Sequence, residues 1–209
     1  MNVTIIGAGN MGRAIGRRAV SGGNQVEILD SNPAEARRLA AELGDTATAL
    51  GPDDSFGGDV VVFALYYPGI KDAVREYGDR LAGKVVVDIT NPGDTETWDR
   101  LATSPGKSSA DEVAELVPEG TPVVKAFNTT FAPTLVAREV DGQQLDVLIA
   151  GDDERAKGKV SELVSSAGLR PVDVGPLARA EDLEHLGLLH ITLQQPRELG
   201  FASTFKLHP

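Results

Sequence analysis

Apolar runs of a few residues alternate along this chain with longer segments in which apolar residues recur at helical spacing. The short runs predict strands, which we expect at residues 3–6, 26–30, 46–50, 59–65, 84–89, 123–127, 146–150 and 170–174. The longer segments predict helices, which we expect at residues 13–20, 32–43, 69–81, 108–116, 132–138 and 154–167. Strands that alternate with helices indicate an α/β fold with a doubly wound, mostly parallel sheet of the Rossmann type.

Two segments depart from this alternation. Residues 93–106 are polar and rich in turn-forming residues, so we expect a mobile surface loop that serves as a lid. Residues 179–193 have helical periodicity, with leucines on one face at Leu183, Leu186, Leu189 and Leu193. No clean linker precedes this helix. We therefore expect one unit over residues 1–176, with a small helical C-terminal appendage over residues 177–209 packed on it.

Composition and charge exclude several functional classes. The 209 residues include no Cys and three His, all near the C-terminus, which excludes disulfides, thiolate metal sites and cysteine nucleophiles. Lys and Arg total 20 against 31 Asp and Glu, so the net charge of -11 repels nucleic acids and anionic lipid. The residues from Met1 to Gly7 do not form a basic segment followed by an apolar one, and no run of about 18 apolar residues occurs. We expect a cytoplasmic protein with no metal site and no nucleic-acid or membrane partner.

The most informative motif is Gly7-Ala8-Gly9-Asn10-Met11-Gly12, which directly follows the first predicted strand and opens the first predicted helix. In a G-x-G-x-x-G loop the first glycine permits the turn, the second lets a pyrophosphate approach the main chain, and the third lets helix and strand pack closely. The helix N-terminus adds free N–H donors and a partial positive charge. A plain glycine turn is the alternative, but the surrounding strand and helix favour dinucleotide binding.

An acidic residue, Asp30, closes the second predicted strand 18 positions after Gly12. There a carboxylate can bind both hydroxyls of the adenosine ribose and repels a 2′-phosphate, which favours NAD over NADP. The next residues, Ser31 and Asn32, can still donate hydrogen bonds to a phosphate. Both nucleotides therefore stay open as the cofactor.

Aromatic and amide residues follow three further strands, at the edge where ligands bind in such sheets. Leu65 and Tyr66 come at the end of the fourth predicted strand, where an aromatic ring offers a flat apolar wall. Asn91 and Pro92 follow the fifth strand and Asn128 follows the sixth, so their amides can hold a carboxamide or a second ring. The alternatives are a tyrosine that packs on the surface and asparagines that only form turns.

No catalytic side chain is predicted. His190 lies on the leucine-rich helix, where a buried structural histidine is expected more often than a proton donor. No Ser-His-Asp arrangement and no close pair of acids with a motif around it occurs. Hydride transfer between two organic cofactors depends on alignment and exclusion of water more than on a side-chain acid or base.

Several motifs occur in order along the whole chain: Gly7 to Gly12, Val86-Val87-Asp88-Ile89-Thr90-Asn91-Pro92, Lys125-Ala126-Phe127-Asn128-Thr129, Gly151-Asp152-Asp153 and Val172-Asp173-Val174-Gly175-Pro176-Leu177. With these motifs the chain resembles the coenzyme F420:NADP oxidoreductase family. The later motifs are specific to that family and its ferric-reductase relatives, whereas many enzymes share the glycine loop. The resemblance implies reversible hydride transfer between the deazaflavin F420 and a nicotinamide, in a small homodimeric protein.

The resemblance also implies where each part of the ligands binds. The pyrophosphate is expected at Gly7, Gly9, Asn10, Met11 and Gly12. The adenosine ribose is expected at Ser31 and Asn32, the middle of the nucleotide at Leu65 and Tyr66, and the nicotinamide at Ala126. The deazaflavin is expected over the nicotinamide, near Asn91, Asn128 and the C-terminal helix. NADP-using members generally have Ser-Arg after the second strand, whereas this chain has Asp30-Ser31-Asn32-Pro33.

These observations favour an oxidoreductase that passes hydride between NAD or NADP and a flat redox partner, F420 or a flavin. Two alternatives stay open. One is a non-catalytic dinucleotide-binding module that reports redox state to a partner. The other is a flavin-dependent reductase of metal or quinone.

Overall fold

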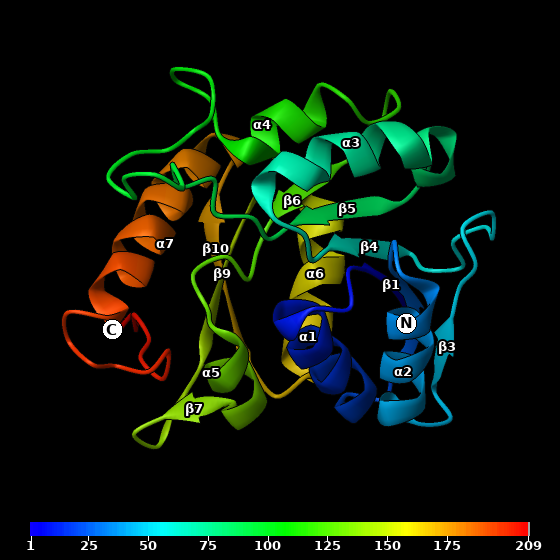
Figure 1. Ribbon diagram of the computed structural model, residues 1–209, viewed down its shortest axis with the longest axis horizontal. Helices are drawn as coiled ribbons and strands as arrows, with labels where there is room; N and C mark the ends of the chain where they lie inside the picture. The colour runs from blue at the N-terminus through cyan, green and yellow to red at the C-terminus, as the bar shows by residue number, and fades with distance from the viewer. Residues whose placement is uncertain (209) are drawn as a thin grey trace.

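Residues 1–208, which the computed structural model describes, form an eight-stranded sheet with helices on both faces (Figure 1). The strand order is β10-β9-β6-β5-β4-β1-β2-β3, and neighbours are parallel except β6 and β9. The strands are β1 (Asn2–Ile6), β2 (Gln25–Leu29), β3 (Ala47–Ala49), β4 (Val60–Phe63), β5 (Val85–Asp88), β6 (Val123–Lys125), β9 (Asp146–Gly151) and β10 (Arg170–Gly175). This topology confirms the predicted doubly wound, mostly parallel sheet.

Helices alternate with the strands along the chain. They are α1 (Asn10–Ser21), α2 (Pro33–Leu43), α3 (Tyr67–Tyr77), α4 (Ser109–Ala114), α5 (Ala132–Ala137), α6 (Glu154–Ser166) and α7 (Ala180–Gln194), with short 3-10 turns η1 (Gly78–Leu81) and η2 (Leu177–Arg179). A separate hairpin, β7 (Glu139–Val140) with β8 (Gln143–Gln144), has no counterpart among the predicted elements. None of the helices within residues 1–208 is both long and apolar enough to cross a membrane.

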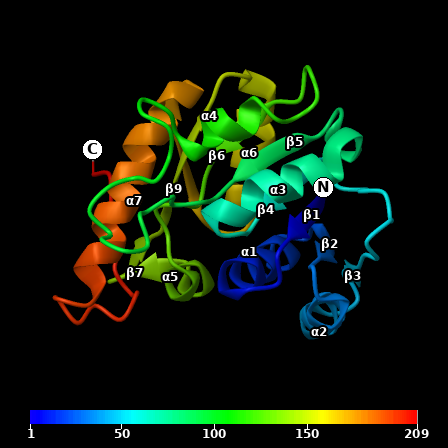
Figure 2. The same ribbon diagram turned by 45° about the horizontal axis from the view of Figure 1, so that its top comes forward.

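The sheet separates two apolar cores. Val60 and Val62 of β4 pack in the core shared with α1, α2, α5 and α6. Val61 and Phe63 pack on the opposite face, with α3 and α4 (Figure 2). Because successive side chains of a strand point to opposite faces, a sheet covered on both faces needs strands that are apolar throughout. This requirement explains the unbroken apolar run from which β4 was predicted.

Element bounds differ from the prediction by a few residues, for identifiable reasons. Helix α1 begins at Asn10 and not at residue 13, because Gly9 is already its extended N-cap. Strand β4 ends at Phe63 and not at Leu65, because Leu65 leaves the sheet and lines a cavity. In both places the chain departs from regular structure at the sheet edge where ligands bind.

The buried face of α7 differs from the predicted leucine stripe. Leu189 is 52% exposed, whereas Glu184 and Gly187 are buried together with Leu183. A Cβ at Gly187 would lie 2.2 Å from the Asn91 side-chain oxygen, so only glycine permits this close approach. Of the four predicted leucines, Leu183 is buried, Leu186 and Leu193 are half-buried and Leu189 is exposed. Ala180 and Leu188 are buried as well, beside the polar contacts and the glycine.

The segment that follows α7 returns to the sheet and is held by the buried carboxylate of Asp146. The Arg170 guanidinium donates to Asp146 at 2.7 Å and 2.5 Å, the Lys206 ammonium at 2.5 Å, and the Leu207 N–H at 3.0 Å. Burial favours the protonated acid, but these donors outweigh burial and lower the pKa of Asp146 to about 2. The carboxylate is therefore a clamp for the C-terminal segment.

Replacing Asp146 by Asn should lower the free energy of unfolding by about 1–3 kcal/mol, because a hydrogen-bonded charge is lost from a buried position. Since the folded-state pKa lies below the ordinary 3.8, this stability is present at neutral pH and disappears as the pH falls from 3.8 towards about 2. Urea unfolding at neutral and acid pH measures both effects. Asp173→Asn is the control, because that side chain is 49% exposed. Equal losses in the two variants would contradict the clamp.

Candidate cofactor and substrate site

The glycine loop between β1 and α1 is closely packed on one side and open on the other. Gly7 has a φ of +109°, and a Cβ there would lie 2.4 Å from the Ala64 carbonyl oxygen. A Cβ at Gly12 would lie 1.9 Å from the Gly7 carbonyl oxygen. A Cβ at Gly9, in contrast, would meet no atom within 4 Å. The first and third glycines are therefore required by the protein's own packing, and the second borders open space.

The N-terminus of α1 is available to a ligand. Gly9 is its N-cap, no side chain caps the helix, and the first turn has no acidic residue. The first N–H groups of a helix have no partner within the helix, and together with the helix dipole they favour an anion. Gly9, Asn10 and Met11 also line a cavity, so the free N–H groups open directly onto it.

Asp30 joins the glycine loop to the turn after β2. Its carboxylate, half-buried, accepts the Ala8 N–H at 2.7 Å and the Asn32 N–H at 2.9 Å. The Asn32 side chain accepts the Ala34 N–H at 3.1 Å and so caps α2. Ser31 is exposed beside them. Asp30 and Asn32 therefore stabilise the glycine loop and the turn after β2. The sequence predicted only their contact with the ribose.

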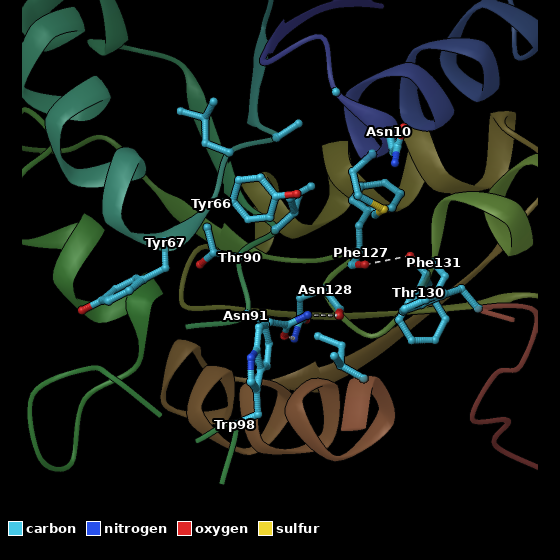
Figure 3. A pocket seen from close by; sticks show the side chains of 17 residues that line it. Asn10, Tyr66, Tyr67, Thr90, Asn91, Trp98, Phe127, Asn128, Thr130 and Phe131 are labelled. Atoms are coloured by element: carbon cyan, nitrogen blue, oxygen red, sulfur yellow. Dashed lines mark hydrogen bonds between the residues drawn. The ribbon is translucent and has the colours of Figure 1, made fainter. Parts of the chain in front are cut away.

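A cavity of about 450 Å³ lies beyond the carboxyl ends of β4, β5 and β6 and next to α7 (Figure 3). All of the described residues that line it are uncharged. Those from the glycine loop and the strand ends are Gly9, Asn10, Met11, Ala64, Leu65, Tyr66, Tyr67, Ile89, Thr90, Asn91, Phe127, Asn128, Thr130 and Phe131. Those from the later loops and α7 are Trp98, Ile191 and Phe201.

The structure brings half of the sequence-predicted site residues to this cavity. The seven that line it are Gly9, Asn10, Met11, Leu65, Tyr66, Asn91 and Asn128. The other predicted residues do not line it: Gly7, Gly12, Asp30, Ser31, Asn32, Pro92 and Ala126. Of these, Gly7 and Gly12 lie buried in the loop, and Pro92 and Ala126 are buried beside Asn91 and Phe127. The Asp30 to Asn32 turn lies next to the glycine loop, at the end of β2.

Aromatic rings from distant segments surround the cavity. Tyr66, 92% exposed, stands at its edge. Trp98 and Phe201 come from loops without periodic patterns, so sequence reasoning missed them. It also missed Phe127, although that residue adjoins Asn128 in a strand-end motif. Both Trp98 and Phe201 have positive φ angles, 56° and 58°, a conformation that non-glycine residues seldom adopt.

Two asparagines form an amide pair at the floor of the cavity (Figure 3). The Asn91 amide nitrogen donates to the Asn128 main-chain carbonyl at 2.7 Å. The Asn128 amide nitrogen donates to the Asn91 side-chain oxygen at 3.0 Å and to the Leu183 carbonyl at 2.8 Å. The side-chain oxygen of Asn128 is buried and accepts no hydrogen bond from the described residues. A buried acceptor left in this state costs about 1–3 kcal/mol.

A fully buried ion triad lies directly behind the amide pair. The Lys125 ammonium donates to Asp88 at 3.0 Å, to Glu184 at 2.6 Å and to the Thr90 carbonyl at 2.7 Å. The three charged side chains are 0% exposed. Burial raises the pKa of Glu184 to about 7, although Lys125 and the Ser109 N–H oppose the rise. The sequence contains a signal for this pair, because Asp88 and Lys125 each end an otherwise apolar strand. We did not predict the ion pair between these two residues from the sequence.

A further network borders the cavity. Glu112 accepts from the Tyr67 hydroxyl at 2.6 Å, from Lys71 at 3.0 Å and from Ser104. Burial favours protonated Glu112, but these donors outweigh burial and lower its pKa to about 2. The contacts tie the loop at residues 93–106 to Tyr67, a cavity residue.

His190 is buried, as predicted, and its ring lies 4.4 Å from that of Phe131. It does not line the cavity, and burial lowers its pKa. No cluster of three or more His, Asp or Glu within residues 1–208 is arranged to hold a metal ion. The free N-terminus of α1 can bind the anionic pyrophosphate bridge, and the uncharged cavity can bind a flat ring. The described residues that line the cavity offer no nucleophile paired with a base.

The chain is similar to known oxidoreductases. Residues 2–92 match the family described as "NADP oxidoreductase coenzyme F420-dependent". The chain is 28% identical over 208 residues to the F420-dependent NADP reductase of Methanocaldococcus jannaschii, which covers 92% of each protein. It is 33% identical over 186 residues to metalloreductase STEAP3 of Rattus norvegicus, covering 89% of this chain and 36% of that protein. The chain thus spans about a third of the length of that relative.

A solved structure from Arthrobacter sp. FB24, described provisionally as an F420-dependent NADP reductase, superimposes over 100% of both chains. The TM-score is 0.86 at 27% sequence identity. The family match covers β1 to β5 and the glycine loop, and the full-length similarities extend it through the amide pair to α7. Residues 2–92 are therefore similar to the coenzyme F420-dependent NADP oxidoreductase family, and the full-length similarities are to proteins described as F420-dependent NADP reductases.

Proposed function

We propose that the protein is an oxidoreductase that binds a nicotinamide dinucleotide across the glycine loop and the cavity and passes hydride between it and a flat redox partner. The observation that carries this proposal is an uncapped helix N-terminus that opens onto an uncharged cavity of aromatic and amide side chains. The first feature favours a pyrophosphate and the second a ring. When bound, the nicotinamide supplies or accepts the hydride.

The protein's own residues align the rings and exclude water. The main-chain N–H groups after Gly9 bind the pyrophosphate, which fixes the nucleotide along the edge of the sheet. Leu65 and Tyr66 contact its middle, and the ring reaches the floor formed by Asn91 and Asn128. Such alignment, together with a dry cavity, supplies most of what a hydride transfer needs.

NADP is the nucleotide that the family's description names, and we propose it for this chain. The sequence argument from Asp30 favours NAD. In the structure, however, both carboxylate oxygens of Asp30 already accept main-chain N–H groups, which disperses part of the negative charge facing a 2′-phosphate. Ser31 is exposed at the same turn and can donate to that phosphate.

F420 is the partner that we propose for the second ring position, because relatives of similar length carry that name. A flavin is the second candidate, because the sequence left a flavin-dependent metal reductase open and the chain is 33% identical to metalloreductase STEAP3. With a flavin, the same cavity would serve a metal reductase. A homodimer and a cytoplasmic location stay predictions.

The direct experiment mixes the purified protein with NADPH or NADH and F420, and follows the visible absorption band of F420. Exchange with F420 supports the first proposal. Exchange only with FMN or FAD supports the second candidate. Tight nucleotide binding without exchange to either acceptor would support the non-catalytic module and overturn both. Trp98 is the only tryptophan and lines the cavity, so quenching of its fluorescence reports binding independently of turnover.

Gly9→Ala should separate binding from folding. A methyl group there meets no protein atom within 4 Å, so the loss of stability should stay below about 1 kcal/mol. The methyl group enters the space of the pyrophosphate, so nucleotide affinity should fall about tenfold or more. Calorimetric titration and thermal unfolding measure the two effects.

Two further glycine variants calibrate this result. Gly12→Ala should lose both folding stability and binding, because its Cβ would lie 1.9 Å from a carbonyl oxygen. Gly158 lies on α6, and a Cβ there would meet no atom within 4 Å. Gly158→Ala should therefore lower neither folding stability nor nucleotide affinity. Unaltered nucleotide affinity in Gly9→Ala would show that the loop does not hold the pyrophosphate.

Ser31→Arg should improve NADPH affinity relative to NADH by about 1–3 kcal/mol, because it adds a charge-assisted donor beside the 2′-phosphate. Asn32 is kept, since its side chain caps α2. Calorimetry with both nucleotides gives the ratio, and Ser161→Arg on α6 controls for the added charge. An equal gain for both nucleotides, or the same ratio in the control, would place the ribose elsewhere.

A further inference from the structure

The buried triad of Asp88, Lys125 and Glu184 has an excess of one acid. Two carboxylates face one ammonium group, and all three side chains are 0% exposed. Charges inside a protein are screened far less than charges in water. With both acids ionised, the triad therefore carries a net negative charge whose field extends into its surroundings.

The triad is connected to the cavity through short contacts. Lys125 donates to the Thr90 carbonyl at 2.7 Å, and Thr90 lines the cavity. Asn128 lies three residues after Lys125, lines the cavity, and donates to the carbonyl of Leu183, the neighbour of Glu184. All described residues of the cavity lining are uncharged. The field of the triad is thus not cancelled by a cation in the lining.

The two forms of a nicotinamide respond differently to such a field. The oxidised ring is a cation and the reduced ring is neutral, while the rest of the nucleotide is the same in both. A buried negative charge behind the ring stabilises the oxidised form more strongly. It therefore favours release of hydride from the nucleotide to its partner.

We infer that the Asp88–Lys125–Glu184 triad acts as a positioning and electrostatic support of the nicotinamide site, which selects the oxidised ring over the reduced ring. The inference rests on the proposed binding of a nicotinamide in the cavity. It assigns a function to a lysine and an acid in two family motifs and to an acid on α7. None of the three touches the reacting atoms, so each acts through the amide floor and through charge.

The surroundings of Glu184 identify which group controls the net charge. Lys125 from β6 and Asp88 from β5 face its carboxylate, and α4 contributes the Ser109 N–H at 2.9 Å. The other ionisable residues of α4, η2 and α7 are Asp111, Glu112, Arg179, Glu181, Asp182, His185 and His190. Glu112 is paired with Lys71, and Arg179 with Asp182. Because burial raises the pKa of Glu184 to about 7, ionisation of Glu184 decides whether the triad carries an excess negative charge.

The test is the ratio of two dissociation constants, that of the oxidised nucleotide over that of the reduced nucleotide, measured by calorimetry with NADP⁺ and NADPH. Glu184→Gln removes one negative charge and should raise this ratio several-fold. A merely structural contribution would weaken both forms together and leave the ratio unchanged. Glu27→Gln is the control, since Glu27 is another acid that accepts main-chain N–H groups, from Gly57 and Gly58, and none of these residues lines the cavity.

Two further measurements keep the test decisive if Glu184→Gln does not fold. Asp88→Asn removes a charge from the same triad and should raise the ratio in the same direction. In the unaltered protein, the ratio should fall as the pH rises through about 7, because Glu184 then ionises. Ionisation of the nucleotide phosphates cancels in the ratio, since both forms carry the same phosphates.

The outcomes distinguish this inference from the proposed function. Binding of both forms, with a ratio that neither the triad variants nor pH alters, overturns the inference and leaves the proposed function intact. Absence of binding by the unaltered protein overturns both. A ratio that rises in the triad variants and stays constant in Glu27→Gln supports the inference.

Discussion

The ammonium group of Lys125 lies between the carboxylates of Asp88 and Glu184, in a region with no access to water. Breaking a buried ion pair is strongly destabilising, because the remaining charge has no partner. Glu184 belongs to α7 and the other two to neighbouring strands of the sheet. The contact therefore requires the C-terminal helix to lie against the ends of β5 and β6, and this arrangement closes one side of the cavity.

This constraint explains why the cavity has a polar floor and apolar walls. Once α7 is held by the ion triad, Gly187 lets it approach Asn91, and Leu183 presents a carbonyl to Asn128. The amides are thus fixed by the same helix that the ions hold. The opposite side of the site depends on Asp30, whose carboxylate joins the glycine loop to the turn after β2. Both ends of the site are shaped by buried or half-buried acids.

Local sequence patterns predicted the sheet and the glycine loop because the physical requirements there are local. A few consecutive residues are enough to recognise an unbroken apolar strand such as β4. The same is true of a glycine whose φ must be positive, such as Gly7. The leucine pattern of α7 did not identify its whole buried face, because a leucine pattern does not report the long-range partner of Glu184.

The aromatic residues of the cavity also could not be predicted from local sequence patterns. Trp98 and Phe201 lie in loops, about a hundred residues apart along the chain, and meet only because α7 and the segment after it fold back on the sheet. No periodicity marks either residue. Asn91 and Asn128, in contrast, could be predicted, since each lies three residues beyond the end of a strand whose carboxyl end faces the ligand edge.

We propose that one dinucleotide extends from the glycine loop into the aromatic cavity. A crystal structure of the protein with the reduced nucleotide is the decisive measurement. It should show the pyrophosphate against the main-chain N–H groups after Gly9 and the nicotinamide on the floor formed by Asn91 and Asn128. A nucleotide bound elsewhere, or a cavity filled by the side chains of Trp98 and Phe201 while the nucleotide is bound, would contradict this proposal.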